Sequence, residues 1–226
     1  MQKGGYSGRL MVVVALFVTC LIVSNIIAVK LIEIRGFVLP AAIVIFPVSY
    51  IIGDVLTEVY GYALARRVIW LGFLCNLVAV LAISVGGMLP GAEVWQGQEA
   101  WNEILGSTPR LLAASFAAYL VGEFVNSYVL ARMKVATGGK HLWTRTIGST
   151  VVGQFADTLI FMTIAFLGVI PFGVLANAAG TQWASKVAFE MLATPLTYIV
   201  IAYLKRAEGV DHYDRGTRFN PFAVAK

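Results

Sequence analysis

The sequence is poor in charge. Asp, Glu, Lys and Arg make up 13% of its 226 residues, whereas hydrophobic residues make up 59%. A soluble domain carries about 25% charged residues. Because a soluble domain of this size keeps much of its surface in water, it could not hide so large an apolar excess. The composition therefore excludes a soluble enzyme, a disordered chain and a nucleic-acid-binding module, and it indicates an integral membrane protein.

Cysteine, histidine and nucleotide-binding motifs are also scarce. Cys20 and Cys75 fall in apolar runs, which favours buried small side chains over a disulfide or a metal pair. His141 and His212 lie in polar segments, so the sequence offers no metal constellation. Residues 138–140 (Gly-Gly-Lys) lack the spacing of a phosphate-binding loop. We therefore expect no enzyme activity, no metal, no cofactor and no ATP hydrolysis by this chain.

Long apolar runs, in contrast, fill the sequence. A membrane helix needs about 20 mostly apolar residues to cross the hydrocarbon layer. Six stretches qualify: about 10–29, 37–60, 68–88, 111–131, 146–170 and 183–204. The sequence thus predicts an all-α membrane protein in which residues 1–226 form one six-helix transmembrane domain. The first run is too long for a signal peptide and lacks a cleavage site, so we expect it to be retained.

The distribution of basic residues predicts the orientation. With six spans, 13 of the 17 Lys and Arg residues lie on the side of the two termini and three on the other side. Basic residues concentrate in cytoplasmic loops. We therefore expect both termini in the cytoplasm.

Local signals refine these spans. The loop 89–108 mixes Trp and Leu with Glu, which favours a short helix in the membrane interface. Thr108 and Pro109 are typical of an N-cap and a first helical turn, here of the fourth span. Pro47 and Pro195 fall inside the second and sixth spans, so each is expected to kink its helix.

Polar side chains within the spans are the main clue to function. Ionised groups in the hydrocarbon are costly and normally face a bundle interior or a polar cavity. Every span carries such groups, many of them three or four residues apart on one helix face: Asn25, Asp54, Glu58, Asn76, Glu123, Asn126, Gln154, Asp157, Lys186 and Glu190. We expect Asp54, Glu123 and Asp157 to converge on one polar cavity.

Structural alternatives remain open for several of these residues. Lys186 and Glu190 are four apart and could simply neutralise each other. Glu58 lies near the cytoplasmic end of its span and could be solvated there. Asn76 is better explained as an interhelical hydrogen-bonding residue. Trp183, beside Lys186, fits either packing or a stacking platform for a ring.

A short internal similarity also occurs. Ser-x-x-x-Gly-Asp at 49–54 and Ser-x-x-x-Gly-Gln at 149–154 are offset by 100 residues. Asn25 and Asn126 are offset by 101 residues. Such offsets are typical of a 3+3 inverted repeat in transporters, although matches this short also arise by chance.

At these residues the chain resembles the queuosine precursor transporter family, also called the "putative vitamin uptake transporter" family. The resemblance is carried by 24–30, by 47–61 with its Gly-Asp-x-x-x-Glu-x-Tyr-Gly element, and by 122–127. It is also carried by Arg145, Ser149, Gly153, Gln154 and Asp157 of the fifth span and by Lys186 and Glu190 of the sixth. It implies uptake of the 7-cyano and 7-aminomethyl 7-deazaguanine precursors of queuosine across the bacterial inner membrane. It also implies a six-helix bundle similar to the substrate-binding subunits of energy-coupling-factor transporters.

A binding site compatible with this resemblance can be assigned. A deazapurine would be held by residues from five of the spans: Asn25, Asp54, Glu123, Asn126, Gln154, Asp157, Trp183, Lys186 and Glu190. The candidates for proton coupling are Asp54, Glu58, Glu123 and Asp157.

Three functions stay open at this point. The first is a standalone carrier of a small nucleobase-like solute. The second is a binding subunit that needs a separate ATPase. The third is a membrane enzyme or scaffold, for which the sequence lacks a catalytic cluster. The expected partners are a small molecule and the lipid bilayer, not nucleic acid, and dimerisation of the chain is left open.

Overall fold

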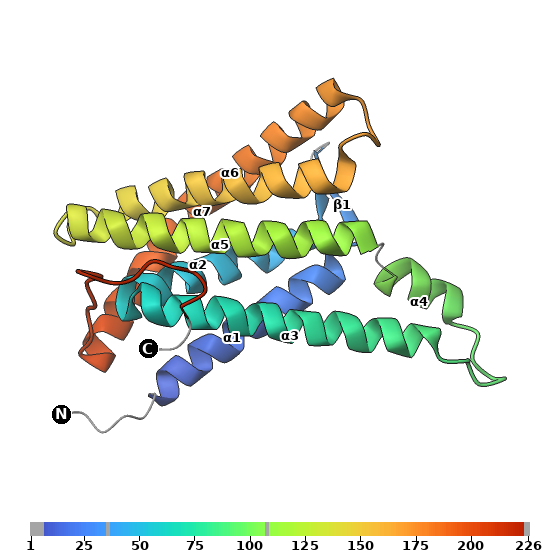
Figure 1. Ribbon diagram of the computed structural model, residues 1–226, viewed down its shortest axis with the longest axis horizontal. Coiled ribbons are helices and arrows are strands. Elements are labelled where there is room, and N and C mark those ends of the chain that lie inside the picture. Colours follow the sequence, from blue (N-terminus) through green and yellow to red (C-terminus); the bar gives the residue numbers. More distant parts are fainter. Residues whose placement is uncertain (1–6, 35–36, 107–108, 224–226) are drawn as a thin grey trace.

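The computed structural model describes residues 7–34, 37–106 and 109–223 (Figure 1). Its elements in chain order are α1 (Gly8–Ile27), β1 (Leu31–Ile34), β2 (Phe37–Pro40), the 3₁₀ helix η1 (Ala41–Val44), α2 (Phe46–Val55), the π-helix η2 (Leu56–Tyr60), α3 (Tyr62–Met88), α4 (Gln98–Leu105), α5 (Pro109–Ala136), α6 (Leu142–Phe166) and α7 (Phe172–Glu208).

The long helices form one bundle around α2. Helix α5 lies between α3 and α6, and α7 packs against α6 (Figure 1). Helix α2 contacts α1, α5 and α7, so it occupies the middle of the bundle. Buried apolar residues pack between these helices, and one such cluster joins Phe17 of α1, Leu56 of η2 and Val68 of α3. The short helix η2 therefore sits where several long helices meet.

The outer surface of the bundle is apolar. Large hydrophobic side chains such as Leu74, Leu81 and Leu192 are more than half exposed. Among the described helices, five stretches are long and apolar enough to cross a membrane: α1, α3, the stretch 98–136, α6 and α7. The predominantly helical fold is thereby confirmed, and its long apolar helices are compatible with the predicted membrane protein.

The second predicted span is wrong in its first part. Residues 37–44 form β2 and η1 instead of α-helix, and β1 pairs antiparallel with β2, with Leu31 opposite Pro40 and Ile34 opposite Phe37. Proline explains the boundary, because a helix from 37 onward would place both Pro40 and Pro47 in its interior, where each removes a hydrogen bond. With the start at Phe46, Pro47 falls in the first turn, where no backbone N–H is needed. Pro47 therefore starts the helix instead of kinking it.

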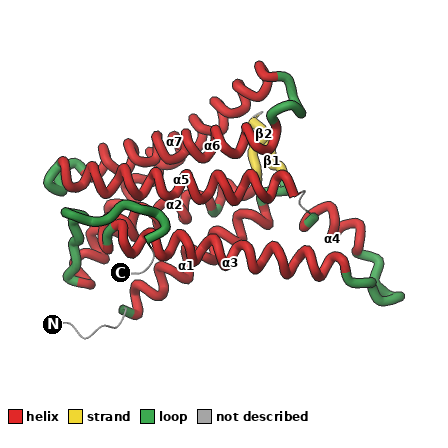
Figure 2. The backbone as a smooth tube through the Cα atoms, in the orientation of Figure 1, coloured by secondary structure: helices red, strands yellow, loops and turns green. Residues whose placement is uncertain are grey.

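The two ends of the bundle differ. The start of α1 and the end of α7 lie together, and the Arg9 guanidinium donates a hydrogen bond of 3.0 Å to the Ala207 carbonyl oxygen. The hairpin β1–β2 and the short helix α4 lie at the opposite end (Figure 2). Helix α4 confirms that the loop before the fourth span contains a short helix. Thr108 lies outside the described residues, and Pro109 is the first residue of α5.

Candidate functional site

Two glycines bring α5 and α6 into close contact. A methyl group at Gly122 would come within 2.7 Å of the Asp157 Cβ atom, and one at Gly153 within 2.7 Å of the Asn126 Cβ atom. Small residues at such positions let two membrane helices approach closely. The crossing therefore places the polar pair Glu123 and Asn126 of α5 beside the polar residues of α6.

Helix α2 contributes a carboxylate to the same place. Asp54 is 1% exposed, and its Oδ1 atom accepts a hydrogen bond of 2.8 Å from the Asn126 Nδ2 group. The Glu123 Oε2 atom lies next to Gly53, 3.2 Å from where a Cβ would stand. The acids of α2 and α5 thus lie near each other across the helix interface.

Helix α7 completes the group through Lys186. Its ammonium group forms an ion pair with Asp157 of α6. Tyr50, one turn before Asp54, interacts with both Lys186 and Gln154. Glu123 interacts electrostatically with Asp157, Glu190 and Lys186, and Asp54 does so with Glu190 and Glu123. We call this group, which comprises Asp54, Glu123, Asn126, Gln154, Asp157, Lys186 and Glu190, the central polar cluster.

The central polar cluster is rich in acceptors that lack donors. The following buried oxygen atoms have no hydrogen-bond partner among the described residues: Asp54 Oδ2, Glu123 Oε2, Asn126 Oδ1, Gln154 Oε1, and Glu190 Oε1 and Oε2. Native proteins pair nearly all buried polar atoms, so a group of such oxygens calls for an explanation. The cluster also holds four carboxyl groups and one cation, and is therefore suited to a guest that brings hydrogen-bond donors.

Two predicted binding residues lie elsewhere or are already engaged. The Asn25 Nδ2 group donates to the Asn76 Oδ1 atom at 3.0 Å, which agrees with the interhelical role expected for Asn76. Asn25 and Asn76 line a cavity of about 330 Å³ between α1, α3, α4, α5 and α6, and no residue of the central polar cluster lines it. Trp183 donates from its ring nitrogen to the Val151 carbonyl oxygen at 3.0 Å, which fixes it against α6.

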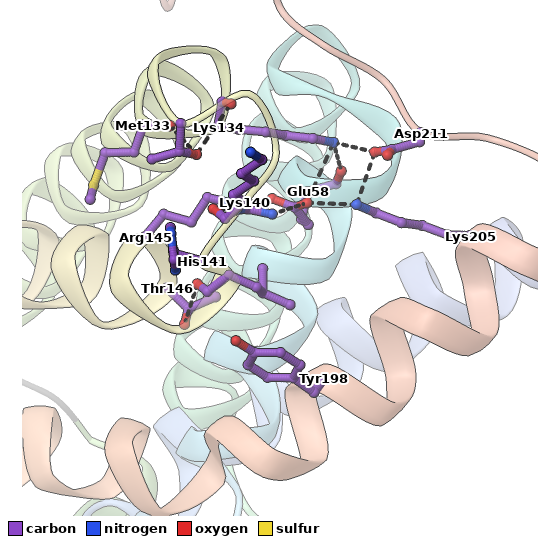
Figure 3. A network of polar contacts seen from close by, with 12 residues as sticks. Glu58, Met133, Lys134, Lys140, His141, Arg145, Thr146, Tyr198, Lys205 and Asp211 are labelled. Carbon is purple, nitrogen blue, oxygen red and sulfur yellow. Dashed lines mark hydrogen bonds and ion pairs between the residues drawn. The ribbon is translucent and has the colours of Figure 1, made fainter.

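Glu58 occupies a different environment from Asp54, although both belong to the second predicted span. Its carboxylate is fully buried and accepts two bonds from Arg145, of 2.9 and 2.7 Å, and one of 2.7 Å from Lys205. Lys134 lies 3.5 Å away and also donates to the Glu58 backbone oxygen. Figure 3 shows these cations pointing toward Glu58 from three helices. Glu58 is therefore paired and not solvated, which differs from one of the two readings of the sequence.

The segment after α7 adds a second acid to this group. Asp211 accepts from Lys134 at 2.6 Å and from Lys205 at 2.9 Å (Figure 3). Partial burial alone would raise the pKa of Asp211, but these hydrogen bonds outweigh it and lower that pKa below its usual range. We call Glu58, Lys134, Arg145, Lys205 and Asp211 the Glu58 ion-pair cluster.

The same segment, residues 209–223, continues across the bundle end. The Tyr62 backbone N–H donates to Asp214 at 2.9 Å. Arg66 donates to two backbone carbonyls of the segment, and Trp70 to a third. Gly61 has a φ of 86° and faces the His212 ring so closely that no side chain would fit there. The segment is thus bound to the start of α3 along its length.

Sequence reasoning missed the partners in both clusters. Tyr50 lies four residues before Asp54, a spacing that places both on one helix face and could have drawn attention to it. Lys134 and Lys205 counted only as basic residues of the cytoplasmic side. No signal in the sequence marked Asp211. Among the described residues no group of three or more His, Cys, Asp or Glu side chains is arranged to hold a metal ion.

Comparisons with known proteins identify the family. The family model described as "Putative vitamin uptake transporter" matches residues 40–200. The "Probable queuosine precursor transporter" of Bacillus subtilis is 30% identical over 176 residues, which is 77% of each chain. The "Queuosine precursor transporter" of Escherichia coli is 31% identical over 121 residues, which is 54% of this chain and 52% of that protein.

No solved structure matches the chain. The matched family and the relatives are transporters, in agreement with the expectation that this chain is not an enzyme. The family model alone covers more than half of the sequence. The chain therefore belongs to the queuosine precursor transporter family, the "putative vitamin uptake transporter" family, and is a multi-pass membrane transporter.

Proposed function

We propose that this chain is a standalone secondary carrier that imports queuosine precursors across the bacterial inner membrane. The substrates are 7-cyano-7-deazaguanine and 7-aminomethyl-7-deazaguanine. The observation that carries the proposal is the set of buried acceptor oxygens without donors in the central polar cluster. The names of the relatives supply the substrate class.

The chemistry of the substrate fits these acceptors. The guanine edge carries a ring N–H and an exocyclic amine side by side, and a carboxylate can accept both at once through charge-assisted bonds. Asp54, held in place by the Asn126 amide, presents a free oxygen for this edge, and Glu123 presents another. Gln154 and Asn126 offer amide oxygens for remaining N–H groups.

The ion pair between Lys186 and Asp157 sits beside this acceptor set. It leaves Asp157 compensated, so Asp54 and Glu123 are the stronger candidates for carrying a coupling proton, since neither has a cation bound to it. Glu58 is held by three cations and we assign it to closing the cytoplasmic end of the bundle. Trp183 stands three residues before Lys186 on α7 and is fixed by its bond to the Val151 carbonyl oxygen, so any stacking on the ring would occur from that position.

The two ends of the bundle support the orientation. Lys134, Arg145 and Lys205 lie with the start of α1 and the end of α7, and the positive-inside rule favours a cytoplasmic location for this basic end. The cavity beside Asn25 lies toward the opposite end, with α4, and would open outward.

The purified chain alone tests the proposal. It is reconstituted into liposomes, and uptake of each labelled precursor is measured with and without a proton gradient. We expect uptake by the chain without any ATPase, and at least about a tenfold loss in Asp54→Asn, since a bond to a charged group contributes about 1.5–3 kcal/mol. Glu99→Gln, an exposed acid of α4, serves as the matched control and should transport normally.

Several outcomes separate the alternatives. Uptake that ignores the proton gradient would indicate facilitated diffusion. Binding of the precursor without uptake would point to a subunit that needs an ATPase. Normal uptake by Asp54→Asn at normal protein level would remove the central polar cluster from the site.

A further inference from the structure

Glu190 is the most isolated acid of the central polar cluster. It is 1% exposed, and neither carboxylate oxygen has a hydrogen-bond partner among the described residues. Lys186 lies four residues before it on α7, a spacing that allows an intrahelical ion pair. The structure instead pairs Lys186 with Asp157 of α6. The one cation of the cluster is therefore engaged on another helix, and Glu190 is left uncompensated.

The neighbours of Glu190 increase this deficit. Asp54 interacts electrostatically with Glu190, and Glu123 does so as well. Asp54 accepts one hydrogen bond from the Asn126 side-chain amide and has no cation bound to it. A buried carboxylate without a partner is strongly unfavourable, so such a group is found paired, protonated or bound to a cation. The region around Asp54 and Glu190 is thus suited to positive charge.

Nearby neutral oxygens point the same way. Asn126 and Gln154 are 7% and 5% exposed, and each keeps an amide oxygen without a donor. A single proton on Glu190 would satisfy only one acceptor. An ammonium group carries three donors and a full charge, so it can satisfy both oxygens of Glu190 together. The central polar cluster, with many acids and few donors, is therefore better satisfied by a bound ammonium group than by a single proton.

We propose that Glu190 determines substrate specificity by binding the ammonium group of the aminomethyl precursor, while Asp54 and Asn126 hold the ring. This inference rests on the proposed function. The nitrile of the cyano precursor is a hydrogen-bond acceptor without donors, so it would face the Glu190 carboxylate unfavourably. Specificity between these two substrates then arises from attraction to one substituent and repulsion of the other.

Competition binding with the purified full chain tests this. Both precursors are titrated against the wild type, Glu190→Gln and the control Glu103→Gln, whose side chain is exposed on α4. We expect the wild type to prefer the aminomethyl compound. Glu190→Gln should lose about tenfold or more in affinity for that compound, with affinity for the cyano compound unchanged or improved. The Glu103→Gln control should match the wild type for both.

The outcomes are distinct. An equal loss for both compounds, or no change for either, would overturn the role of Glu190 and leave the proposed function standing. A wild type that binds neither compound would overturn the proposed function, and this inference with it. If Glu190→Gln does not fold, Glu190→Asp retains the charge on a shorter side chain. It should weaken binding of the aminomethyl compound alone, and equal weakening of both would again count against the proposal.

Discussion

Removing the charge of Glu58 should destabilise the protein more than any exposed acid can. Glu58→Gln keeps the size of the side chain but leaves Arg145, Lys134 and Lys205 near a neutral group. Arg145 is 1% exposed and would retain its bond to the Lys140 carbonyl oxygen, but at position 58 it would meet one neutral amide oxygen in place of two carboxylate oxygens. Lys134 and Lys205 would then share Asp211 as their remaining acid.

The magnitude follows from burial. Breaking a buried ion pair by removing one partner costs about 3–5 kcal/mol, because the other charge stays buried and unpaired. In a domain of 150–250 residues, each kcal/mol shifts the unfolding midpoint by about 2–4 °C. We therefore expect Glu58→Gln to lower the midpoint by about 6–20 °C. Asp211, whose side chain is 43% exposed, belongs to the same cluster but is screened by solvent. Asp211→Asn should cost at most about 1 kcal/mol.

The assay is thermal unfolding of the purified chain in detergent, followed by the fluorescence of its tryptophans. The comparison of Glu58→Gln with Asp211→Asn removes one charge from the same cluster in both cases, so it isolates the effect of burial. Equal shifts in the two variants would refute the reasoning, since burial would then not decide the energy. A smaller shift for Glu58→Gln than for Asp211→Asn would refute it as well.

Three further results are expected. Gly153→Ala should force α5 and α6 apart and lower both stability and uptake, whereas Gly180→Ala, which meets nothing within 4 Å, should be neutral or slightly stabilising in a thermal unfolding assay. Lys186→Met should destabilise the protein by leaving Asp157 without its cation, and the added change Asp157→Asn should restore part of the loss in a double-mutant cycle. Because the pKa of Asp211 is lowered in the folded protein, its contribution to stability is complete above about pH 4, its unfolded value, and is lost as the pH falls through the folded pKa. Asp211→Asn should therefore flatten the acid limb of the stability–pH profile, and an unchanged limb would contradict this.

The helices were predictable because their signal is local. Runs of about 20 apolar residues foretold α1, α3, α5, α6 and α7 to within several residues at most ends, since length and hydropathy alone decide whether a segment can span the bilayer. The longest deviation at a start is in α7, which begins at Phe172 and not near 183. There Phe172, Val174 and Leu175 form a short apolar turn, and the residues 176–182 that follow are small or polar, so the long apolar run begins only at Trp183 although the helix is continuous.

The pairing of side chains was less predictable, because it depends on which helices touch. Spacing placed Lys186 and Glu190 on one face of α7, and from that an intrahelical pair was a fair reading. The close approach of α5 and α6 at Gly122 and Gly153 instead presents Asp157 to Lys186. An interhelical distance of this kind is set by the packing of the whole bundle, which no single segment encodes.

Asp54 and Glu58 show that a buried charge alone does not mark a binding site. They are four residues apart in the second predicted span, and both are at most 1% exposed. Glu58 is bonded to Arg145 and Lys205 and needs nothing further, so it serves to hold helices together. Asp54 accepts a single hydrogen bond, from the Asn126 amide, and its other oxygen has no donor.

The difference between these two acids lies in their counter-charge. A fixed cation that already neutralises an acid would have to be displaced before a substrate could bind there, and that displacement costs energy. An acid that lacks such a cation gains from a guest that brings a donor or a positive charge. The uncompensated acids Asp54, Glu123 and Glu190 therefore carry the proposed binding site, whereas the compensated acid Glu58 holds α5, α6 and α7 together at its end of the bundle.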